Sequence, residues 1–452
     1  VLGILWALLV YALPNLAVGI FGVSLAAMGS GVVYGGGSWI PTYFDLSWYL
    51  SWILPGAGLA LNLDLITMST GFLLPYSSVL SMLIGSLMIS VLGNAVALKL
   101  DWPAARAWQQ DYTPGMSYPL IYWRSWMWIW LSFTLGASVA VAVHTLVTYR
   151  RSILRAFISL RKLRRARGEI PLQVIALMVI VGITGTIVLY KTLIPAYPLW
   201  NLLLFSGAWV FASALINSLG QAEAGFNVQI PLIDRVAVIA SGYAGADAWY
   251  APIYVGGIYA PVIGTIPTLS NAAQFCYVYK VAYETRTNPL DFYKGLVVSM
   301  VFGVVFGLIW TQAFLMLAPI PSGVYPGTIF SWAYRAQHTM MFITWSKVIF
   351  NRELMLIGFA VASSLILVSR IVNLRGLSII ALLIGMGMPV DASIALSLGY
   401  VIGRVVGNRL GEDRWREIRG AVVAGLMMGA GLMTGIAVTI IMIARAIWPL
   451  PL

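Results

Sequence analysis

One pattern of glycine, proline and asparagine occurs twice in this sequence, each time inside a long apolar stretch. The two copies keep every spacing at an offset of 314 residues and consist of Gly71, Pro75, Gly85, Gly93 and Asn94, and of Gly385, Pro389, Gly399, Gly407 and Asn408. Proline lacks a backbone N–H and glycine restricts its backbone little, so both interrupt helices. The pattern therefore predicts two membrane helices that break at corresponding places, and paired breaks of this kind mark the central binding site of a transporter.

Chance is the alternative explanation of the repeat, because glycine is frequent in this chain, with 44 residues. Common descent of the two segments is favoured by their surroundings. Two of the few acidic residues in apolar stretches lie beside the copies, Asp64 before the first break and Asp391 after the second.

The chain as a whole has the composition of an integral membrane protein. Hydrophobic residues make up 60% of the sequence and charged residues only 9%, whereas soluble domains carry about a quarter charged residues. Long apolar stretches, rather than short alternating segments, favour helices over a β-barrel. We expect an all-α polytopic membrane protein with about 10–14 transmembrane or half-membrane helices, some of them re-entrant, and an internal repeat.

The net charge of +12 is concentrated at one place along the chain. Eight of the 27 basic residues lie between positions 149 and 167: Arg150, Arg151, Arg155, Arg161, Lys162, Arg164, Arg165 and Arg167. Short loops rich in Lys and Arg stay on the cytoplasmic side of a membrane. We therefore predict a cytoplasmic loop at 149–169 of a multi-pass cell-membrane protein, with the lipid bilayer rather than nucleic acid as its partner.

This loop separates two predicted repeats. The expected parts are residues 1–148, with a break at 71–75, and residues 170–452, with breaks near 242–267 and at 385–389. When spans are counted from the cytoplasmic loop, the first copy of the pattern ends outside the membrane near Lys99. The second copy ends inside near Arg409. This map predicts an inverted repeat, but one miscounted re-entrant segment would make the duplication parallel.

Four acidic residues lie in apolar or glycine-rich surroundings: Asp64, Glu223, Asp247 and Asp391. An ionisable group at the bilayer centre costs a few kcal/mol, so each is a candidate for binding substrate or a coupling ion, and proton coupling is one option. Each could instead cap a half-helix, because an Asp at a helix start accepts hydrogen bonds from unpaired N–H groups. Both roles can coexist in Asp391.

The other candidate residues either mark the breaks or add hydrogen-bonding groups. Half-helix N-termini attract carboxylates, so a peptide C-terminus would suit the breaks. Side-chain amides could bind a peptide-like or chelate-like solute. These candidates are Gly71, Pro75, Gly385 and Pro389 at the breaks, and Asn227, Gln229, Asn271 and Gln274 among the amides. The sequence indicates no metal site and no cofactor motif.

Two other classes of membrane protein compete with a transporter. A membrane enzyme is disfavoured, because the two histidines, His144 and His338, are predicted on different sides and no catalytic constellation has a recognisable spacing. A non-transporting scaffold subunit would have no cavity between the repeats. A channel would carry a selectivity-filter signature, and none is visible.

Several segments resemble the oligopeptide transporter superfamily, which includes the yellow-stripe-like carriers of metal chelates. The run from Ala424 to Met433 resembles the S-G-L-I-A-G-E-G-L-M run near the C-terminus of that family. The stretch from Phe275 to Pro289 resembles its D-L-K-x-G loop, and Gly385 to Pro389 resembles its G-M-Y-L-P core. The helix from Trp130 to Leu146 also resembles its counterpart in the first half, so the similarity extends over residues 60 to 450.

The chain departs from the family pattern at informative positions. The acidic residue of G-E-G is Ala430 here, and Val278 and Ala282 replace the D and G of D-L-K-x-G. If that Glu contributes to proton coupling in relatives, this chain couples otherwise or not at all. The resemblance also implies more spans than this chain holds, so we expect N-terminal spans to be missing or never present.

The resemblance and the breaks together predict a secondary-active transporter of oligopeptide-like or metal-chelate-like solutes that works by alternating access. The alternatives are a non-transporting scaffold and, after it, a membrane-embedded enzyme. A homo-oligomer is compatible with the sequence. Substrate, coupling ion and direction of transport are not encoded in any pattern we found.

Overall fold

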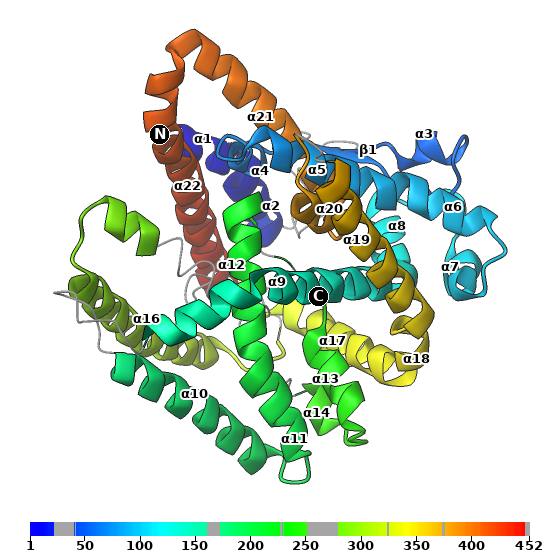
Figure 1. The fold of residues 1–452 in the computed structure, drawn as a ribbon. Helices are drawn as coiled ribbons and strands as arrows, with labels where there is room; N and C mark the ends of the chain where they lie inside the picture. The colour runs from blue at the N-terminus through cyan, green and yellow to red at the C-terminus, as the bar shows by residue number, and fades with distance from the viewer. Residues whose placement is uncertain are drawn as a thin grey trace. The chain divides into compact units, whose positions relative to one another are not determined.

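The computed structural model describes most of the chain and is almost entirely helical (Figure 1). The described residues are 1–21, 40, 42–160, 172–226, 228, 230–250, 279–322, 325–372 and 376–447. Within them, nine helical stretches are long and apolar enough to cross a membrane. These are Leu2–Phe21, Tyr76–Lys99, Tyr118–Ser152, Ala176–Leu193, Leu199–Ala224, Leu290–Leu317, Ser346–Ser369, Val390–Leu410 and Glu412–Ala444. The chain is therefore an all-α polytopic membrane protein, as its composition predicts.

The chain divides into two compact units, each built from segments that are distant in sequence. Unit 1 comprises Val1–Ser132, Leu315–Arg335 and Ser369–Leu452, and unit 2 comprises Phe133–Phe314 and Ala336–Val368. The two units thus alternate along the chain. The division into consecutive repeats around the basic loop stays a prediction, and residues 161–169 of that loop lie outside the described residues.

Unit 1 contains both copies of the repeated pattern and the two short strands. Its first elements are α1 (Leu2–Ala7), η1 (Leu8–Ala12), α2 (Leu13–Phe21), β1 (Tyr43–Asp45), α3 (Ser47–Ser51), β2 (Ala60–Asn62), α4 (Leu65–Thr70), α5 (Tyr76–Leu87), η2 (Met88–Gly93) and α6 (Asn94–Lys99). They continue with η3 (Pro103–Ala105), α7 (Arg106–Asp111), α8 (Tyr118–Ser125), η4 (Trp126–Trp130), α20 (Ile379–Met386), α21 (Val390–Leu410) and α22 (Glu412–Ile447). The segments η1, η2 and η4 are π-helical turns within longer helices.

Both copies of the repeat form a short helix, a break and a second helix. In the first copy α4 ends at Thr70 and α5 begins after Pro75, and in the second α20 ends at Met386 and α21 begins after Pro389. Each proline stands at the N-cap, where its missing N–H costs no helical hydrogen bond. The sequence therefore predicts both breaks at the right places.

The two broken segments pack against each other through their repeated glycines. A Cβ on Gly71 would overlap with the Leu396 carbonyl oxygen, and a Cβ on Gly385 would overlap with the Met82 carbonyl oxygen. Leu396 and Met82 are themselves separated by the repeat offset. Gly85 and Gly399 behave in the same way. Each copy thus offers the same surface to the other, as the subunits of a two-fold dimer do, and α5 lies against α20 (Figure 1).

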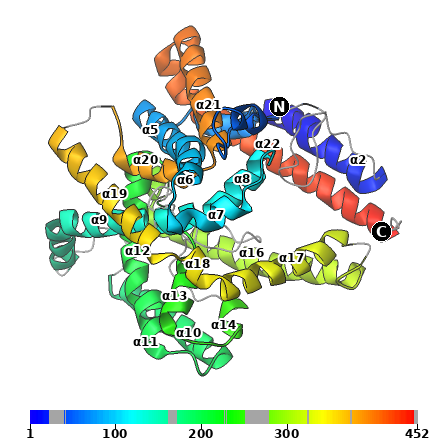
Figure 2. The same cartoon turned by 90° about the vertical axis from the view of Figure 1, so that its right-hand side faces the viewer.

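The N-terminal helices of unit 1 lie along α22. Both α1 and α2 run beside it, as Figure 2 shows in blue and red. A Cβ on Gly3 would clash with the backbone of α22 at Leu426, and a Cβ on Gly429 would clash with Ile4. Glycines at helix contacts let backbones approach closely in membrane proteins. Gly429 therefore allows close packing of α1 against α22.

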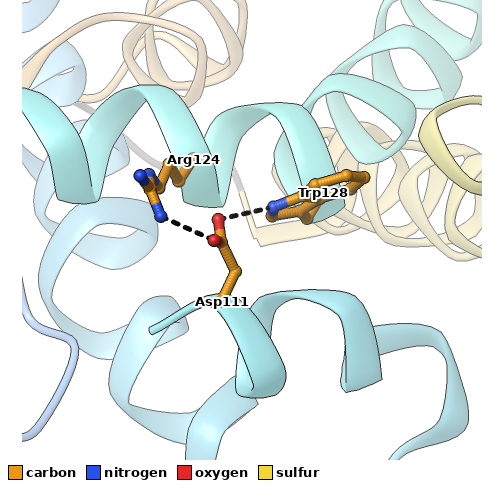
Figure 3. A network of polar contacts seen from close by, with 3 residues as sticks. All are labelled: Asp111, Arg124 and Trp128. Atoms are coloured by element: carbon orange, nitrogen blue, oxygen red, sulfur yellow. Dashed lines mark hydrogen bonds and ion pairs between the residues drawn. The ribbon is translucent and has the colours of Figure 1, made fainter. Parts of the chain in front are cut away.

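A polar network joins α7 to the helix that starts at α8 (Figure 3). The Asp111 carboxylate accepts a hydrogen bond from Arg124 Nη1 at 2.6 Å and another from Trp128 Nε1 at 2.9 Å. Trp128 lies on the π-helical turn η4. Because the Arg124 side chain is 40% exposed, solvent weakens this ion pair, and its net contribution to stability is below about 1 kcal/mol.

Unit 2 holds the remaining long helices. They are α9 (Leu131–Leu160), α10 (Leu172–Leu193), α11 (Leu199–Leu202), η5 (Leu203–Ala208), α12 (Trp209–Ala224), α13 (Ile233–Ser241), α14 (Asp247–Tyr250), α16 (Pro289–Leu317), α17 (Pro326–Thr344), α18 (Ser346–Ile349) and α19 (Arg352–Val372). Of these, α9 begins in unit 1, α16 and α19 end in unit 1, and α17 belongs to unit 1 up to Arg335. Helices α9 and α19 cross closely. Gly136 faces the Met355 carbonyl oxygen and Gly358 faces the Phe133 carbonyl oxygen.

Candidate functional site

The candidate site of unit 1 lies at the second break, where α21 begins. Asp391 is in the first turn of this helix, and only 9% of the residue is exposed. Its Oδ1 atom is buried and has no hydrogen-bond partner among the described residues. A buried carboxylate oxygen without a partner is costly. The N-cap position of α21 is Pro389, and the carboxyl group of Asp391, two residues further on, interacts with the N–H of Ala392.

A two-stranded ribbon supplies one wall of this site. Strands β1 and β2 are antiparallel, and their register pairs Tyr43 with Asn62. Directly paired residues of two strands place their side chains on the same face. Asn62 also connects the two acidic residues of the unit, because its Oδ1 accepts a hydrogen bond from the Asp64 N–H at 2.9 Å and its side chain interacts with the Asp391 carboxyl group.

Tyr118, the first residue of α8, closes the site on another side. Its hydroxyl oxygen accepts a hydrogen bond from the Val390 N–H at 2.8 Å, and the hydroxyl also interacts with Asp391. The Tyr118 backbone is fixed in turn, since its N–H donates to Asp45 Oδ2 at 2.6 Å. The other oxygen of Asp45 accepts from the Ser47 N–H. The ribbon thus positions the tyrosine that contacts the break.

The Tyr43 hydroxyl is the second buried polar group of the site without a hydrogen-bond partner in the described part of the chain. Tyr43 is 6% exposed and packs with Ala60, Tyr118 and Val390. Burial, and then the negative charges of Asp391 and Asp45, raise the pKa of Tyr43 above its ordinary value. Tyr43 therefore stays a neutral phenol that can donate one hydrogen bond and offer its oxygen to a ligand.

Asp64 is the N-cap of α4, ahead of the first break, and both of its carboxylate oxygens accept hydrogen bonds within unit 1. Its Oδ1 accepts from Trp6 Nε1 at 3.0 Å and from the Tyr11 hydroxyl at 2.5 Å, and its Oδ2 accepts from the N–H and the hydroxyl of Thr67. This is the N-cap arrangement that the sequence leaves open as an alternative. Ser378, its counterpart in the second copy, caps α20 by accepting from the Ala381 N–H.

Three of the four half-helix N-termini are already occupied by side chains of the protein. The side chains of Asp64 and Ser378 accept hydrogen bonds from backbone N–H groups at the starts of α4 and α20. The Tyr118 hydroxyl accepts one from the Val390 N–H at the start of α21. The predicted capture of a substrate carboxylate at these ends stays a prediction. For α21 it would require Tyr118 to give up its hydrogen bond.

The other two acidic candidates belong to unit 2 and are exposed. Asp247 begins α14, accepts a hydrogen bond from the Ala248 N–H at 2.9 Å and another from the Tyr243 hydroxyl at 3.1 Å. Glu223 lies in the last turn of α12. Within single units, the structure therefore brings together Asp64 and Asp391 through Asn62.

The remaining candidates divide into two groups. Gly71 and Gly385 are buried at the crossing of the segments, while Pro75 is exposed and Pro389 half-buried. The amide residues Asn227, Gln229, Asn271 and Gln274 lie outside the described residues, as does most of the break predicted near 242–267. Among the residues that are described, no three His, Cys, Asp or Glu side chains form a group that could hold a metal ion.

Three residues of the site were not found from the sequence: Tyr43, Asn62 and Tyr118. Tyr43 and Asn62 lie on three-residue strands, which are too short to give an alternating pattern. Tyr118 is far from Asp391 in sequence, and its role depends on a fold contact. The one available signal was Asn62 itself, a polar residue two positions before the acid that precedes the first break.

A family comparison gives the class of the protein. The family model described as OPT oligopeptide transporter protein matches residues 16–447, nearly the whole chain. The chain belongs to the oligopeptide transporter family. No curated protein and no solved structure matched it.

Family membership and the apolar helices together make this oligopeptide transporter family member a multi-pass membrane protein that transports oligopeptide-type substrates. The family consists of transporters and not enzymes. The family resemblance predicted from the run at 424–433 and from the second break is confirmed.

Proposed function

We propose that this oligopeptide transporter family member is a secondary-active carrier of peptide-like or metal-chelate-like solutes, and that it works by alternating access around the two breaks. Discontinuous helices in paired segments form the central sites of such carriers. The chain would lie in the cell membrane with the basic loop at 149–169 on the cytoplasmic side, as short basic loops do.

The reciprocal glycine contact supports this proposal most directly. Gly71, Gly85, Gly385 and Gly399 bring two broken helices into backbone contact at equivalent places. Irregular backbone at membrane depth is tolerated where protein or a water-filled cavity surrounds it. A scaffold subunit needs no such pair of breaks, whereas a carrier uses them to present polar backbone and side chains to a solute.

The direction of the contact between α5 and α20 agrees with an inverted repeat in which each copy keeps one direction through its break. Gly85 faces Leu382, while Met82 faces Gly385. Residue numbers therefore increase along α5 in the direction in which they decrease along α20. This is the contact of two antiparallel segments. Inverted repeats are related by a two-fold axis in the membrane plane, which reverses the direction of one copy relative to the other.

We assign solute or ion binding in this proposal to the residues around the breaks, with Asp391 as the leading candidate in unit 1. Its unpartnered Oδ1 distinguishes it from Asp64, whose oxygens are all used. Glu223, Asp247 and the four amides remain candidates for contacts in unit 2. Proton coupling would need at least one of these acids to change its protonation state during transport.

Uptake by proteoliposomes tests the proposal. The purified full-length chain would be reconstituted and given a labelled tetrapeptide or a labelled iron chelate, with and without a pH gradient, beside protein-free liposomes. We expect saturable uptake of one probe and counterflow against the unlabelled form of the same solute. A folded, monodisperse protein that supports neither uptake nor counterflow of either probe would overturn the carrier and favour the scaffold.

A further inference from the structure

We propose that Asp391 and Tyr43 form a binding site for a small monovalent cation, Na⁺. The site itself rests on the geometry of unit 1. Its use as a coupling site rests in addition on the proposed function as a secondary-active carrier.

The charge of Asp391 requires a partner. An ionised carboxylate that is removed from water costs several kcal/mol unless a cation or hydrogen bonds compensate it. In the described part of the chain, no Lys or Arg forms an ion pair with Asp391. Hydrogen-bonding groups on Asn62, Tyr118 and Ala392 approach the carboxyl group, yet Oδ1 is left over. A bound cation would supply both the charge and the missing contact.

The chemistry of the surrounding atoms suits a hard cation. Asp391 Oδ1 and the Tyr43 hydroxyl are both oxygens, both buried and both without a hydrogen-bond partner in the described residues. Hard cations prefer oxygen ligands. The break also contains the C-terminal end of α20, where the Gly387 carbonyl oxygen accepts a long contact of 3.4 Å from the Tyr122 hydroxyl. Unwound carbonyls and helix C-terminal ends coordinate Na⁺ in carriers with broken helices.

The burial of the two oxygen-bearing side chains favours a single ion over a larger solute. Asp391 and Tyr43 are each at least nine-tenths buried, and apolar side chains of Ala60 and Val390 pack around Tyr43. A peptide ammonium group would have to bring its attached chain into this core. A dehydrated Na⁺ needs only the ligand oxygens.

The site is also held rigidly. Asn62 joins Asp391 to the backbone of Asp64, and Asp45 fixes the backbone of Tyr118. Groups around a metal ligand that fix its orientation contribute strongly to affinity. Because Asn62 contacts Asp391 at the second break and the backbone of Asp64 at the start of α4, a cation on Asp391 would be linked to the first copy of the repeat.

Binding of radioactive ²²Na⁺ to the purified full-length chain in detergent tests the site. We expect saturable binding to the wild type, competition by unlabelled Na⁺ and not by choline, and an affinity lowered by about tenfold or more in Asp391→Asn. Tyr43→Phe removes one ligand oxygen and keeps the ring, so it should lower the affinity less. Asp413→Asn is the matched control, because Asp413 is an exposed acid in the first turn of α22 and its loss should leave binding unchanged.

Two outcomes would overturn the sodium site. One is the absence of saturable ²²Na⁺ binding to folded wild-type protein at both acid and alkaline pH, which would leave a proton or a water molecule as the partner of Asp391. The other is binding that Asp391→Asn and Tyr43→Phe both leave intact. If Asp391→Asn does not fold, Tyr43→Phe decides alone.

The transport assay separates this inference from the proposed function. Sodium binding that depends on Asp391, in a protein that moves neither probe solute, would keep the site and refute the carrier. Solute uptake that a sodium gradient does not drive, together with no sodium binding, would keep the carrier and refute the site.

Discussion

The hydroxyl oxygen of Tyr118 accepts a hydrogen bond from the backbone N–H of Val390 at 2.8 Å, across 272 residues of sequence. Val390 is the first residue of α21, where the N–H groups of a helix have no partner within the helix. A tyrosine from a different helix thus completes the start of the second broken segment. The Tyr118 hydroxyl also interacts with the Asp391 carboxyl group, so one side chain contacts both the helix start and the buried acid of the break.

Tyr118→Phe should therefore destabilise unit 1. The substitution leaves the buried Val390 N–H without an acceptor, which costs about 1–3 kcal/mol. Thermal unfolding of the purified protein measures the loss. Tyr122→Phe is the matched control, because the Tyr122 hydroxyl lies at the long distance of 3.4 Å from the Gly387 carbonyl oxygen, and we expect a smaller shift. Equal shifts in the two variants would contradict the assigned role of Tyr118.

The close backbone contacts at the repeated glycines predict that alanine substitutions there destabilise the protein much more than alanine substitutions at glycines with open space around them. In Gly71→Ala the new methyl group would overlap with the Leu396 carbonyl, and in Gly399→Ala with the Met68 carbonyl. Backbone cannot yield as a flexible side chain does, so each variant should lose about 1–3 kcal/mol or more. Size-exclusion profiles after heating provide the measurement.

The control for this experiment is Gly435→Ala in α22, because nothing lies within 4 Å of a Cβ at that position. Alanine there should be neutral or gain up to about 1 kcal/mol from its higher helix propensity. If Gly435→Ala were as damaging as Gly71→Ala, backbone overlap at the crossing would not explain the result.

Asp64 predicts a structural defect in its variants. Asp64→Asn replaces one acceptor oxygen by a donor amide, which must then face the donors of Thr67 or those of Trp6 and Tyr11. We expect a loss of about 1–3 kcal/mol in stability, and a change in Trp fluorescence as Trp6 loses its acceptor. A variant of wild-type stability that no longer transports solute would instead give Asp64 a direct role in binding.

The half-buried His338 leads us to predict that the stability of unit 2 depends on pH. Burial, and then the positive charge of Arg235, lower the pKa of His338 from its ordinary value of 6.5. The unfolded chain therefore binds this proton more readily than the folded chain does. The stability that depends on a neutral His338 is present above pH 6.5 and is lost as the pH falls from 6.5 towards the lowered pKa.

Urea unfolding at a series of pH values measures this effect, and His338→Gln should flatten the curve below pH 6.5. Comparison of the variant and the wild type at about pH 8, where the ring is neutral in both states, gives the cost of losing the ring itself. A variant that keeps the full pH dependence would contradict the role of His338. Asp234 could not replace it, because burial raises the pKa of its carboxyl and the stability linked to that group falls as the pH rises.

The sequence predicts the membrane helices and the two breaks well, because both depend on local properties. A run of apolar residues must become a helix in lipid, and Pro75 and Pro389 must stand at helix starts. Long apolar helices such as the observed Leu199–Ala224 and Leu290–Leu317 were accordingly predicted as a class. The π-helical turns η2 and η4 were not, since a single turn with a different hydrogen-bond spacing inside a helix leaves the composition and the apolar pattern unchanged.

The candidate site was predicted only in part, because its partners are long-range. The sequence identifies Asp391 as an acid beside a break and leaves capping open. It does not show that Tyr43 and Tyr118 meet this acid, since a three-residue ribbon and a helix start bring them there. For Asp64, the capping alternative describes the observed contacts, and the donors from Trp6 and Tyr11 could not have been foreseen.

Each copy of the repeat supplies both the glycines and the carbonyl groups that they face. Two identical segments could therefore make the same reciprocal contact. A polypeptide of half this length could therefore build the same core by pairing with an identical molecule. Once two such halves are joined in one gene, each can change without the other. The helix-start positions show this freedom: Asp64 in one copy corresponds to Ser378 in the other, so only the first copy carries a charge there.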